Sequence, residues 1–319
     1  MPESAGPGTA GAVGPTPAGR TPIPGAPFGR VLTAMVTPFT ADGSALDLAA
    51  AQQLASDLIE LGNDGLVISG TTGESPTTTD REKADLLRAV VDAVGDRAYV
   101  VAGAGTNDTA HSVELARQAA AAGAHGLLVV TPYYNKPPQS GLLAHFTAVA
   151  DATDLPVMVY DIPARTGVPI ALDTLLRLAE HPRIVADKDA KGDLFAAQQL
   201  LASCDLAVYS GDDALNLPLL AVGAAGFVSV TGHLVADRLA ALVECYLAGE
   251  VLKAREINEG LVPVTVGVMT RTQGAIMVKA ALDLLGRTGG GALRSPLVAA
   301  TDAERALLAG DLARAGLTR

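Results

Sequence analysis

The chain contains 319 residues, of which 49% are hydrophobic and 3% aromatic, and its formal net charge is −11. This length suffices for one large barrel with an additional segment, and the low aromatic content favours helix-rich α/β packing over an all-β sandwich. The acidic balance, without a run of Lys or Arg, argues against nucleic acid as a partner. There is neither an apolar leader nor an apolar stretch of about 18 residues, and the two cysteines form no metal or redox motif. We therefore expect a cytoplasmic protein without a membrane span.

The first 27 residues are predicted to form a disordered tail. They consist mainly of Pro, Gly, Ala, Ser and Thr and hold few large apolar side chains. Such a segment buries too little apolar surface to offset the entropy that is lost on ordering. We therefore expect the folded part of the chain to begin at residue 28.

Eight short apolar runs alternate with longer segments of helical periodicity in the middle of the chain. The runs occupy residues 31–36, 65–69, 98–102, 126–130, 156–160, 184–188, 206–210 and 226–230. Their spacing of roughly 20 to 35 residues is that of a β/α unit, and their continuous Val, Ile and Leu content is typical of strands covered on both faces. No glycine fingerprint of a dinucleotide-binding sheet follows the first run, so we predict a closed (β/α)8 TIM barrel over residues 28–235.

Helical periodicity also dominates the last part of the chain, with patterns near residues 236–248, 251–268, 273–286 and 302–315. We therefore predict a C-terminal helical region over residues 236–319, an appendage of the barrel rather than a second core. Within the barrel, Asp47 and Asp80 stand at the expected starts of two helices, where a carboxylate can cap free backbone N–H groups.

Lys188 is the first candidate for a catalytic residue. It lies in the strand-like run 184–188, where a solvated lysine is not expected, and it is one of only six lysines in the chain. Burial favours the neutral form of an amine, and a neutral amine attacks carbonyl carbon, so this position indicates Schiff-base chemistry. The alternative is an edge lysine that is paired with Asp187 or Asp189.

Polar side chains also follow the other predicted strands, at the ends that form the active site of a β/α barrel. Thr71 and Thr72 form a glycine-flanked pair whose backbone amides can grip a small carboxylate, while Tyr134, Tyr160 and Arg165 follow the fourth and fifth strands. Each has a structural alternative. The threonines can be turn formers, Tyr160 a core aromatic residue and Arg165 the partner in a surface ion pair.

The remaining polar groups favour structural roles. Asp212 and Asp213 are expected to cap a helix, and Glu74 is expected to tie down its loop. The five histidines show no metal-ligand spacing, and the sequence contains no phosphate-binding loop and no serine-nucleophile motif. We therefore expect neither a metal nor a cofactor.

Five segments of the sequence together resemble the dihydrodipicolinate synthase family, in particular its actinobacterial form. They are GTTGESPTTTDREK, TPYYNKPP, YDIPARTG, KDAKGD and SGDDALNLPLL, and the resemblance extends from about residue 28 to the C-terminus. It implies a TIM barrel of the pyruvate-dependent class I aldolase superfamily. The implied reaction is the condensation of pyruvate with L-aspartate 4-semialdehyde, the first committed step toward diaminopimelate and lysine. The resemblance also implies a homotetramer that needs no cofactor.

The resemblance implies a role for each polar residue at the predicted strand ends. Lys188 would form the Schiff base with pyruvate, and Tyr160 would relay protons through Thr72 to Tyr134, which the neighbouring subunit would contribute. A protonated Schiff base acts as an electron sink, so the pyruvate methyl group can lose a proton without help from a metal. A chain of hydroxyl groups within hydrogen-bond reach can carry that proton.

The substrate-binding residues follow from the same resemblance. Thr71 and Thr72 would hold the pyruvate carboxylate, and main-chain groups at Gly211 and Val228 would line the lysine pocket. Arg165 would take the carboxylate of the second substrate in a forked pair. Related sugar-acid aldolases generally lack this arginine. An aldolase acting on another 2-keto acid and a non-catalytic keto-acid-binding paralogue remain the alternatives.

The sequence departs from the family pattern in three places. Asp187 stands where the family usually has an apolar residue, and strand alternation would turn it away from Lys188 toward the helices. Asp80, Lys83 and His111 replace the contacts that bind lysine in the feedback-inhibited members, so inhibition by lysine is not expected. Residues 231–233 read Thr-Gly-His rather than the commoner turn.

Overall fold

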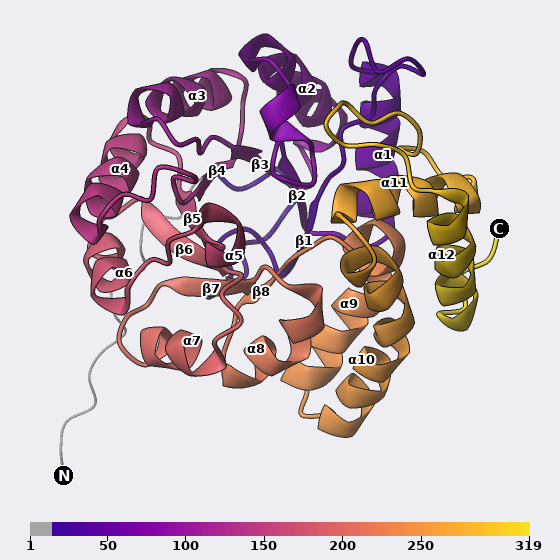
Figure 1. Cartoon of the computed structure of the whole chain (residues 1–319). Helices are drawn as coiled ribbons and strands as arrows, with labels where there is room; N and C mark the ends of the chain where they lie inside the picture. The colour runs from indigo at the N-terminus through magenta and orange to yellow at the C-terminus, as the bar shows by residue number, and fades with distance from the viewer. Residues whose placement is uncertain (1–14) are drawn as a thin grey trace.

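The computed structural model describes residues 15–319, and the expectation for residues 1–14 lies outside this range. Eight parallel strands form a closed barrel in which each strand pairs with its sequence neighbours and β1 pairs with β8 (Figure 1). The strands are β1 Val31–Ala34, β2 Gly65–Ile68, β3 Tyr99–Gly103, β4 Gly126–Val130, β5 Val157–Asp161, β6 Ile184–Asp189, β7 Ala207–Ser210 and β8 Gly226–Ser229. The predicted (β/α)8 TIM barrel is confirmed.

Apolar side chains lie on both faces of this sheet, because the strands alternate between the inside of the barrel and the helices. One cluster fills the inside and includes Leu32, Val67, Met158 and Val228. A larger cluster joins the outer face of the strands to the helices. The continuous apolar runs of the sequence therefore mark strands that are buried on both faces.

The helices cover the outside of the barrel in chain order. They are α1 Leu48–Glu60, α2 Asp80–Val94, α3 Thr109–Ala121, α4 Gln139–Asp151, α6 Leu172–Ala179, α7 Leu194–Leu201, α8 Asn216–Val222 and α9 Gly232–Leu247, with the short α5 Pro163–Thr166 after β5. Asp47 caps α1 as predicted. The prediction for Asp80 was wrong, because Thr79 caps α2. Its hydroxyl accepts from the backbone of Glu82, and the Glu82 carboxylate accepts from the Thr79 backbone.

The boundary predicted between residues 235 and 236 falls within one helix, next to a break in its helical geometry. Helix α9 spans this boundary, with a kink at Val235, and packs against β1 and α1 as the eighth helix of the barrel. The C-terminal region therefore begins with α10 Val251–Thr265 and continues through a π-helical turn Val266–Thr270, α11 Gly274–Leu285 and α12 Asp302–Arg314. These helices gather on one side of the barrel beside α9 (Figure 1).

Residues 15–27 are not the disordered tail that their composition predicts. The backbone N–H of Gly19 donates to Asp96, the Arg20 guanidinium lies 2.6 Å from the Asp64 carboxylate, and Ala26 is buried in the cluster inside the barrel. The segment runs along the amino ends of the strands, so it adds its few apolar groups to a core that the barrel supplies. Its composition therefore did not predict its order.

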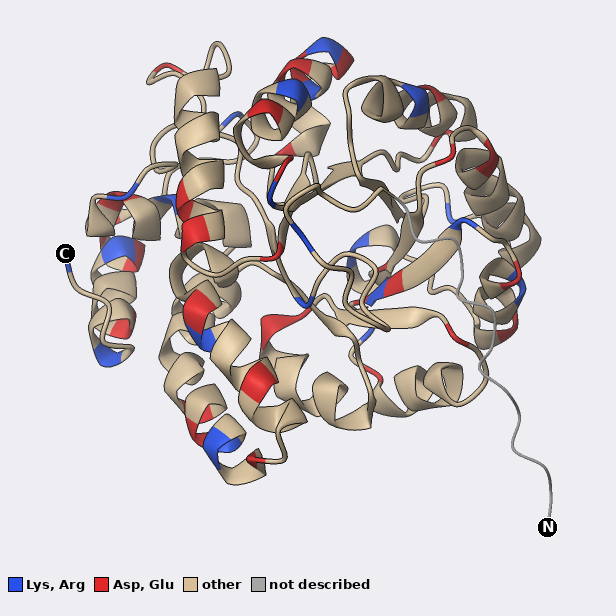
Figure 2. Ribbon diagram, turned by 180° about the vertical axis from the view of Figure 1, so that it is seen from behind, with Lys and Arg blue, Asp and Glu red and all other residues tan. Residues whose placement is uncertain are grey.

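The surface charges and the helix lengths complete this description. Figure 2 shows Lys and Arg interspersed with Asp and Glu along the outer helices. Within residues 15–319, no single helix is long and apolar enough to cross a membrane. One sharply bent pair of segments, Val251–Thr270 with Gly274–Leu285, meets the criterion of length and composition together.

Candidate active site

Strand β6 directs Lys188 into the barrel near its carboxyl end. The side chain is 5% exposed, and its Nζ atom lies 4.1 Å from the centre of the Tyr160 ring on the neighbouring strand β5. Burial lowers the pKa of Lys188 to about 7; Asp213 opposes this shift and Arg165 adds to it. A large share of the amine is therefore neutral near pH 7, as a nucleophile requires.

The alternative of an edge lysine paired with an aspartate is wrong. Lys188 forms no ion pair within residues 15–319, and Asp187 and Asp189 lie on the outer face of β6. There the ammonium of Lys191, rather than that of Lys188, lies 3.6 Å from Asp189 and 3.4 Å from Asp161. Lys188 thus has burial without a charged partner in contact.

Tyr160 lies beside Lys188 and carries a phenol that can donate a proton. Its side chain is 6% exposed, and burial raises the pKa of its phenol to about 12, while Arg165 and a hydrogen bond with the Thr71 side chain act in the opposite direction. The phenol is therefore protonated at neutral pH. The Thr71 side chain is a hydrogen-bond partner of this phenol, whereas the resemblance implies a relay through Thr72.

Gly211 lies against the side chain of Lys188. A Cβ atom on Gly211 would lie 2.9 Å from Cε and 3.0 Å from Cγ of Lys188, so this position leaves the room that the side chain occupies. The Gly211 N–H donates to the carbonyl of Asp189 at 2.7 Å. Val228 is buried inside the barrel in the same cluster as Tyr160.

Asp213 has a role that its position near a helix start did not predict. Asp212 makes the expected cap by accepting from the Ala214 backbone. The buried carboxylate of Asp213 instead accepts from the N–H groups of Val230 and Thr231, both at 2.8 Å, and from the Ser229 hydroxyl. It thus ties the end of β8 to the loop after β7. The only sequence signal for this role of Asp213 is that it follows Asp212 directly, since one of the two aspartates is enough to cap the helix.

Arg165 lies in the short helix α5 and Tyr134 on the loop after β4, both at the rim, and both are exposed. Arg165 forms no ion pair within the part of the chain that the structure describes, but its charge acts on Tyr160 and Lys188. Tyr134 is 88% exposed, with a left-handed φ of 74°, and its N–H donates to the Thr166 carbonyl at 3.3 Å. The structure does not bring its phenol to Tyr160 of the same chain.

Asp187 faces the helices, as strand alternation predicts. It is fully buried, and neither carboxylate oxygen has a hydrogen-bond partner. Burial raises the pKa of this carboxyl well above its usual range, the nearby Lys191 opposes the shift, and Asp189 and Asp161 reinforce it. The protonated acid is the form that this apolar position favours. Among residues 15–319, no group of three or more His, Cys, Asp or Glu side chains is arranged to hold a metal ion.

Together, the closed barrel and the buried lysine at the carboxyl end of β6 define a (β/α)8-barrel enzyme of the Schiff-base class. The chain matches the model of the dihydrodipicolinate synthetase family over residues 27–315. It is 65% identical to 4-hydroxy-tetrahydrodipicolinate synthase 2 of Streptomyces coelicolor over 93% of this chain and 98% of the relative. The chain therefore belongs to the dihydrodipicolinate synthetase family, and the predicted lyase class is confirmed.

Solved structures agree with this assignment. A dihydrodipicolinate synthase from Cyanidioschyzon merolae, with lysine bound, superposes with a TM-score of 0.88 at 42% identity, covering 91% of this chain and 99% of that one. The enzyme of Acinetobacter baumannii in complex with pyruvate superposes with a TM-score of 0.87 at 34% identity, with coverage of 91% and 99%. The predicted fold and family are both confirmed.

Proposed function

We propose that this enzyme condenses pyruvate with L-aspartate 4-semialdehyde to give 4-hydroxy-tetrahydrodipicolinate, with Lys188 as the Schiff-base residue. The observation that carries the proposal is the buried amine of Lys188, which has a pKa of about 7 and lies against Tyr160. A relative that is 65% identical carries the name of this synthase. At neutral pH, an ordinary lysine on the surface is almost entirely protonated, because water solvates its charge.

The reaction follows from the state of this amine. Neutral Lys188 adds to the carbonyl carbon of pyruvate, and loss of water leaves a protonated imine. The methyl group then loses a proton, its C–H electron pair forms the C=C bond of the enamine, and the π pair of the C=N bond moves onto the nitrogen and neutralises its positive charge. The enamine carbon forms a bond to the aldehyde carbon of the second substrate, whose oxygen takes up a proton. The amino group of the second substrate then forms a bond to the imine carbon and displaces the Lys188 amine, which closes the ring of 4-hydroxy-tetrahydrodipicolinate and restores the free lysine. A neutral amine and a nearby phenol suffice for the proton transfers of these steps.

Tyr160 and Thr71 are the proton-transfer groups of this proposal. The protonated phenol of Tyr160 supplies the proton with which water leaves, and the Thr71 hydroxyl beside it passes protons toward the rim. The backbone amides of the glycine-flanked loop, with Thr71 and Thr72, bind the pyruvate carboxylate. Arg165 binds the carboxylate of the second substrate, for which it has a free guanidinium at the rim.

Tyr134 completes the relay from a neighbouring subunit, which requires at least a dimer, and we propose the tetramer of the family. An 88% exposed phenol on a backbone held in the left-handed region supports a role outside its own chain.

We further propose that the enzyme acts in the cytoplasm, because its two cysteines are free thiols, as is usual in a reducing compartment. The positions of Lys and Arg, which are scattered along the ribbon in Figure 2, support small molecules rather than nucleic acid as ligands.

Reductive trapping tests the proposal. The enzyme is incubated with pyruvate and a borohydride reductant, and peptide mass spectrometry locates the adduct. We expect the reduced pyruvyl group on Lys188 and none in the Lys188→Met variant. An adduct on another lysine, or none, would refute the assigned nucleophile. A coupled assay with aspartate semialdehyde then tests the product, because a sugar-acid aldolase would trap pyruvate and yet leave this aldehyde unused.

A further inference from the structure

Glu74 closes the loop that carries Thr71 and Thr72. Its φ of 55° lies in the left-handed region, which residues other than glycine adopt only when surrounding contacts enforce it. The Glu74 N–H donates to the Thr71 carbonyl at 3.2 Å, and the Ser75 N–H donates to Gly70 at 3.3 Å. Any movement of the Glu74 backbone is therefore transmitted directly to Thr71.

The Glu74 carboxylate is held by Lys279 of the C-terminal region, 205 residues away in the sequence. The Lys279 Nζ atom lies 2.6 Å from Glu74 Oε1 and donates to the Ala292 carbonyl, also at 2.6 Å. Both side chains of the pair are 1% exposed, and the ammonium lies 4.5 Å from the centre of the Phe39 ring. This ion pair is thus fully enclosed.

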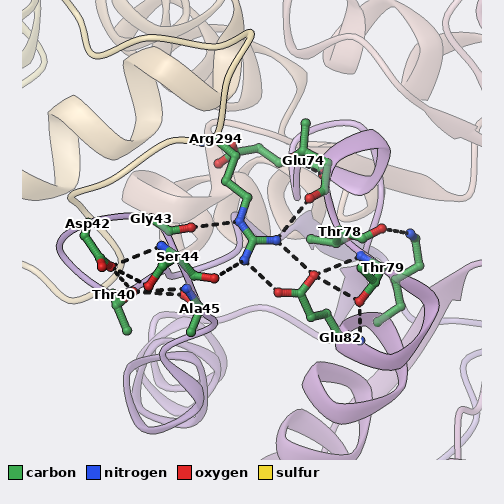
Figure 3. A network of polar contacts seen from close by, with 12 residues as sticks. Thr40, Asp42, Gly43, Ser44, Ala45, Glu74, Thr78, Thr79, Glu82 and Arg294 are labelled. Atoms are coloured by element: carbon green, nitrogen blue, oxygen red, sulfur yellow. Dashed lines mark hydrogen bonds and ion pairs between the residues drawn. The ribbon is translucent and has the colours of Figure 1, made fainter.

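Arg294 holds the second carboxylate oxygen and the surroundings of the loop. Its backbone N–H donates to Glu74 Oε2 at 2.9 Å, while its guanidinium donates to both oxygens of Glu82 and to the carbonyls of Thr77 and Gly43. Figure 3 shows the Arg294 guanidinium bonded to Gly43 and Ser44 in the loop before α1 and to Glu82 in the first turn of α2. The hydrogen bond from Arg294 is the main reason that the pKa of Glu82 falls to about 2.

We propose that Glu74, Lys279 and Arg294 are positioning residues through which the C-terminal region holds the Thr71–Thr72 loop in the conformation that binds pyruvate. This inference rests on the proposed function, because it takes the loop as the carboxylate site. Glycine on either side of the two threonines leaves the loop free to adopt other conformations. Thr37 holds the carboxyl end of the loop through a 2.6 Å bond from its hydroxyl to the Gly73 carbonyl, and the carboxylate of the adjacent Glu74 anchors the same end.

The chemistry of a buried ion pair supports positioning rather than stability. Enclosed pairs contribute little net stability, because desolvation offsets their attraction, yet they fix the geometry of the groups that they join. Loss of the pair would release Glu74 from its left-handed backbone and displace Thr71 from the phenol of Tyr160. The affinity for pyruvate would fall, whereas the aldehyde substrate, which meets the enzyme later, would be affected less.

The test uses the double variant Glu74→Gln/Lys279→Met in the full-length enzyme. Removing both charges leaves no uncompensated ion in the interior, so the variant is expected to fold. The readout is the pyruvate concentration that half-saturates reductive trapping at Lys188. Loss of charge-assisted hydrogen bonds predicts a rise of about tenfold or more in this concentration, with less than about a twofold change in the KM for aspartate semialdehyde.

The control is a second ion pair of the C-terminal region that does not touch the loop, in which the aspartate is buried and the arginine side chain is 22% exposed. Arg271 Nη2 lies 2.5 Å from the buried Asp311 Oδ2, between the π-helical turn and α12. The variant Arg271→Met/Asp311→Asn is expected to keep the wild-type half-saturation, which separates positioning from a general loosening of the C-terminal region. An equal shift in both double variants would overturn the inference.

Two further results decide the remaining cases. If the wild-type enzyme forms no adduct at Lys188, the proposed function fails, and this inference fails with it. If the wild-type enzyme is trapped and the Glu74→Gln/Lys279→Met variant half-saturates at the same pyruvate concentration, the inference alone fails. Should that variant not fold, Arg294→Met serves instead. It keeps the backbone bond to Glu74, so a smaller rise of the same kind is expected, and no rise would overturn the inference.

Discussion

The pH dependence of Schiff-base formation tests the central feature of the site. At pH 7, an amine with a pKa of about 7 is about half neutral, whereas one with the ordinary value of 10.5 is neutral in roughly one molecule in 3,000. Burial of Lys188 therefore increases the concentration of the nucleophile by about a thousandfold at this pH. The corresponding free-energy difference is about 5 kcal/mol.

The assay measures the rate of adduct formation with cyanoborohydride at pyruvate concentrations far below saturation, from pH 5.5 to 10. Because the neutral form reacts, the rate is expected to rise with pH, to reach half its maximum near the pKa of about 7, and to level off above it. At pH 6, it should be about one-tenth of the plateau. Arg165 lowers the pKa of Lys188, so Arg165→Ala is expected to move the midpoint upward.

The outcome that contradicts this reasoning is a midpoint above about pH 9, close to the ordinary value for lysine. Lys188 would then be solvated in the working enzyme, and its burial in the barrel would not explain its reactivity. A downward shift in Arg165→Ala would contradict the role of the guanidinium, because removing a neighbouring positive charge can only favour protonation of the amine.

Arg165→Ala should also raise the KM for aspartate semialdehyde by about ten- to a hundredfold and leave the KM for pyruvate nearly unchanged, because a forked charge-assisted pair is lost. Steady-state kinetics with each substrate varied in turn would measure this, and an unchanged aldehyde KM would argue against the assigned contact. Gly211→Ala places a methyl group 2.9 Å from Lys188 Cε, so trapping should slow by roughly ten- to a hundredfold in a protein with unchanged circular dichroism. Tyr134→Phe should lower kcat by about a hundredfold or more, and a kcat equal to that of the wild type would remove this phenol from the relay.

The strands and the buried lysine could be predicted from the sequence because their signals are local. A continuous apolar run marks a strand covered on both faces, and a lysine within such a run has few alternatives to burial. Strand β4, for example, occupies the predicted residues. The expected loop-tying role of Glu74 is confirmed, yet its partner Lys279 could not be found, because no sequence spacing relates residues 205 positions apart.

The errors share a physical cause, which is that local pattern does not encode where a segment meets the rest of the fold. Composition indicated a disordered tail, although residues 15–27 dock on a barrel that already has its core. Likewise, the sequence of α9 predicts a helix but not that this helix packs against β1 as part of the barrel.

The segment before β1 bears on how the chain can be shortened. The family match starts at residue 27, yet the Asp64 carboxylate that receives Arg20 also accepts the N–H groups of Arg30 and Val31 at 2.7 and 3.0 Å. Trimming the chain to the family boundary would remove Arg20, the counterion of Asp64, at the point where β1 enters the barrel. A crystallographer seeking a minimal protein would do better to cut ahead of Pro17, whose ring is already packed away from water.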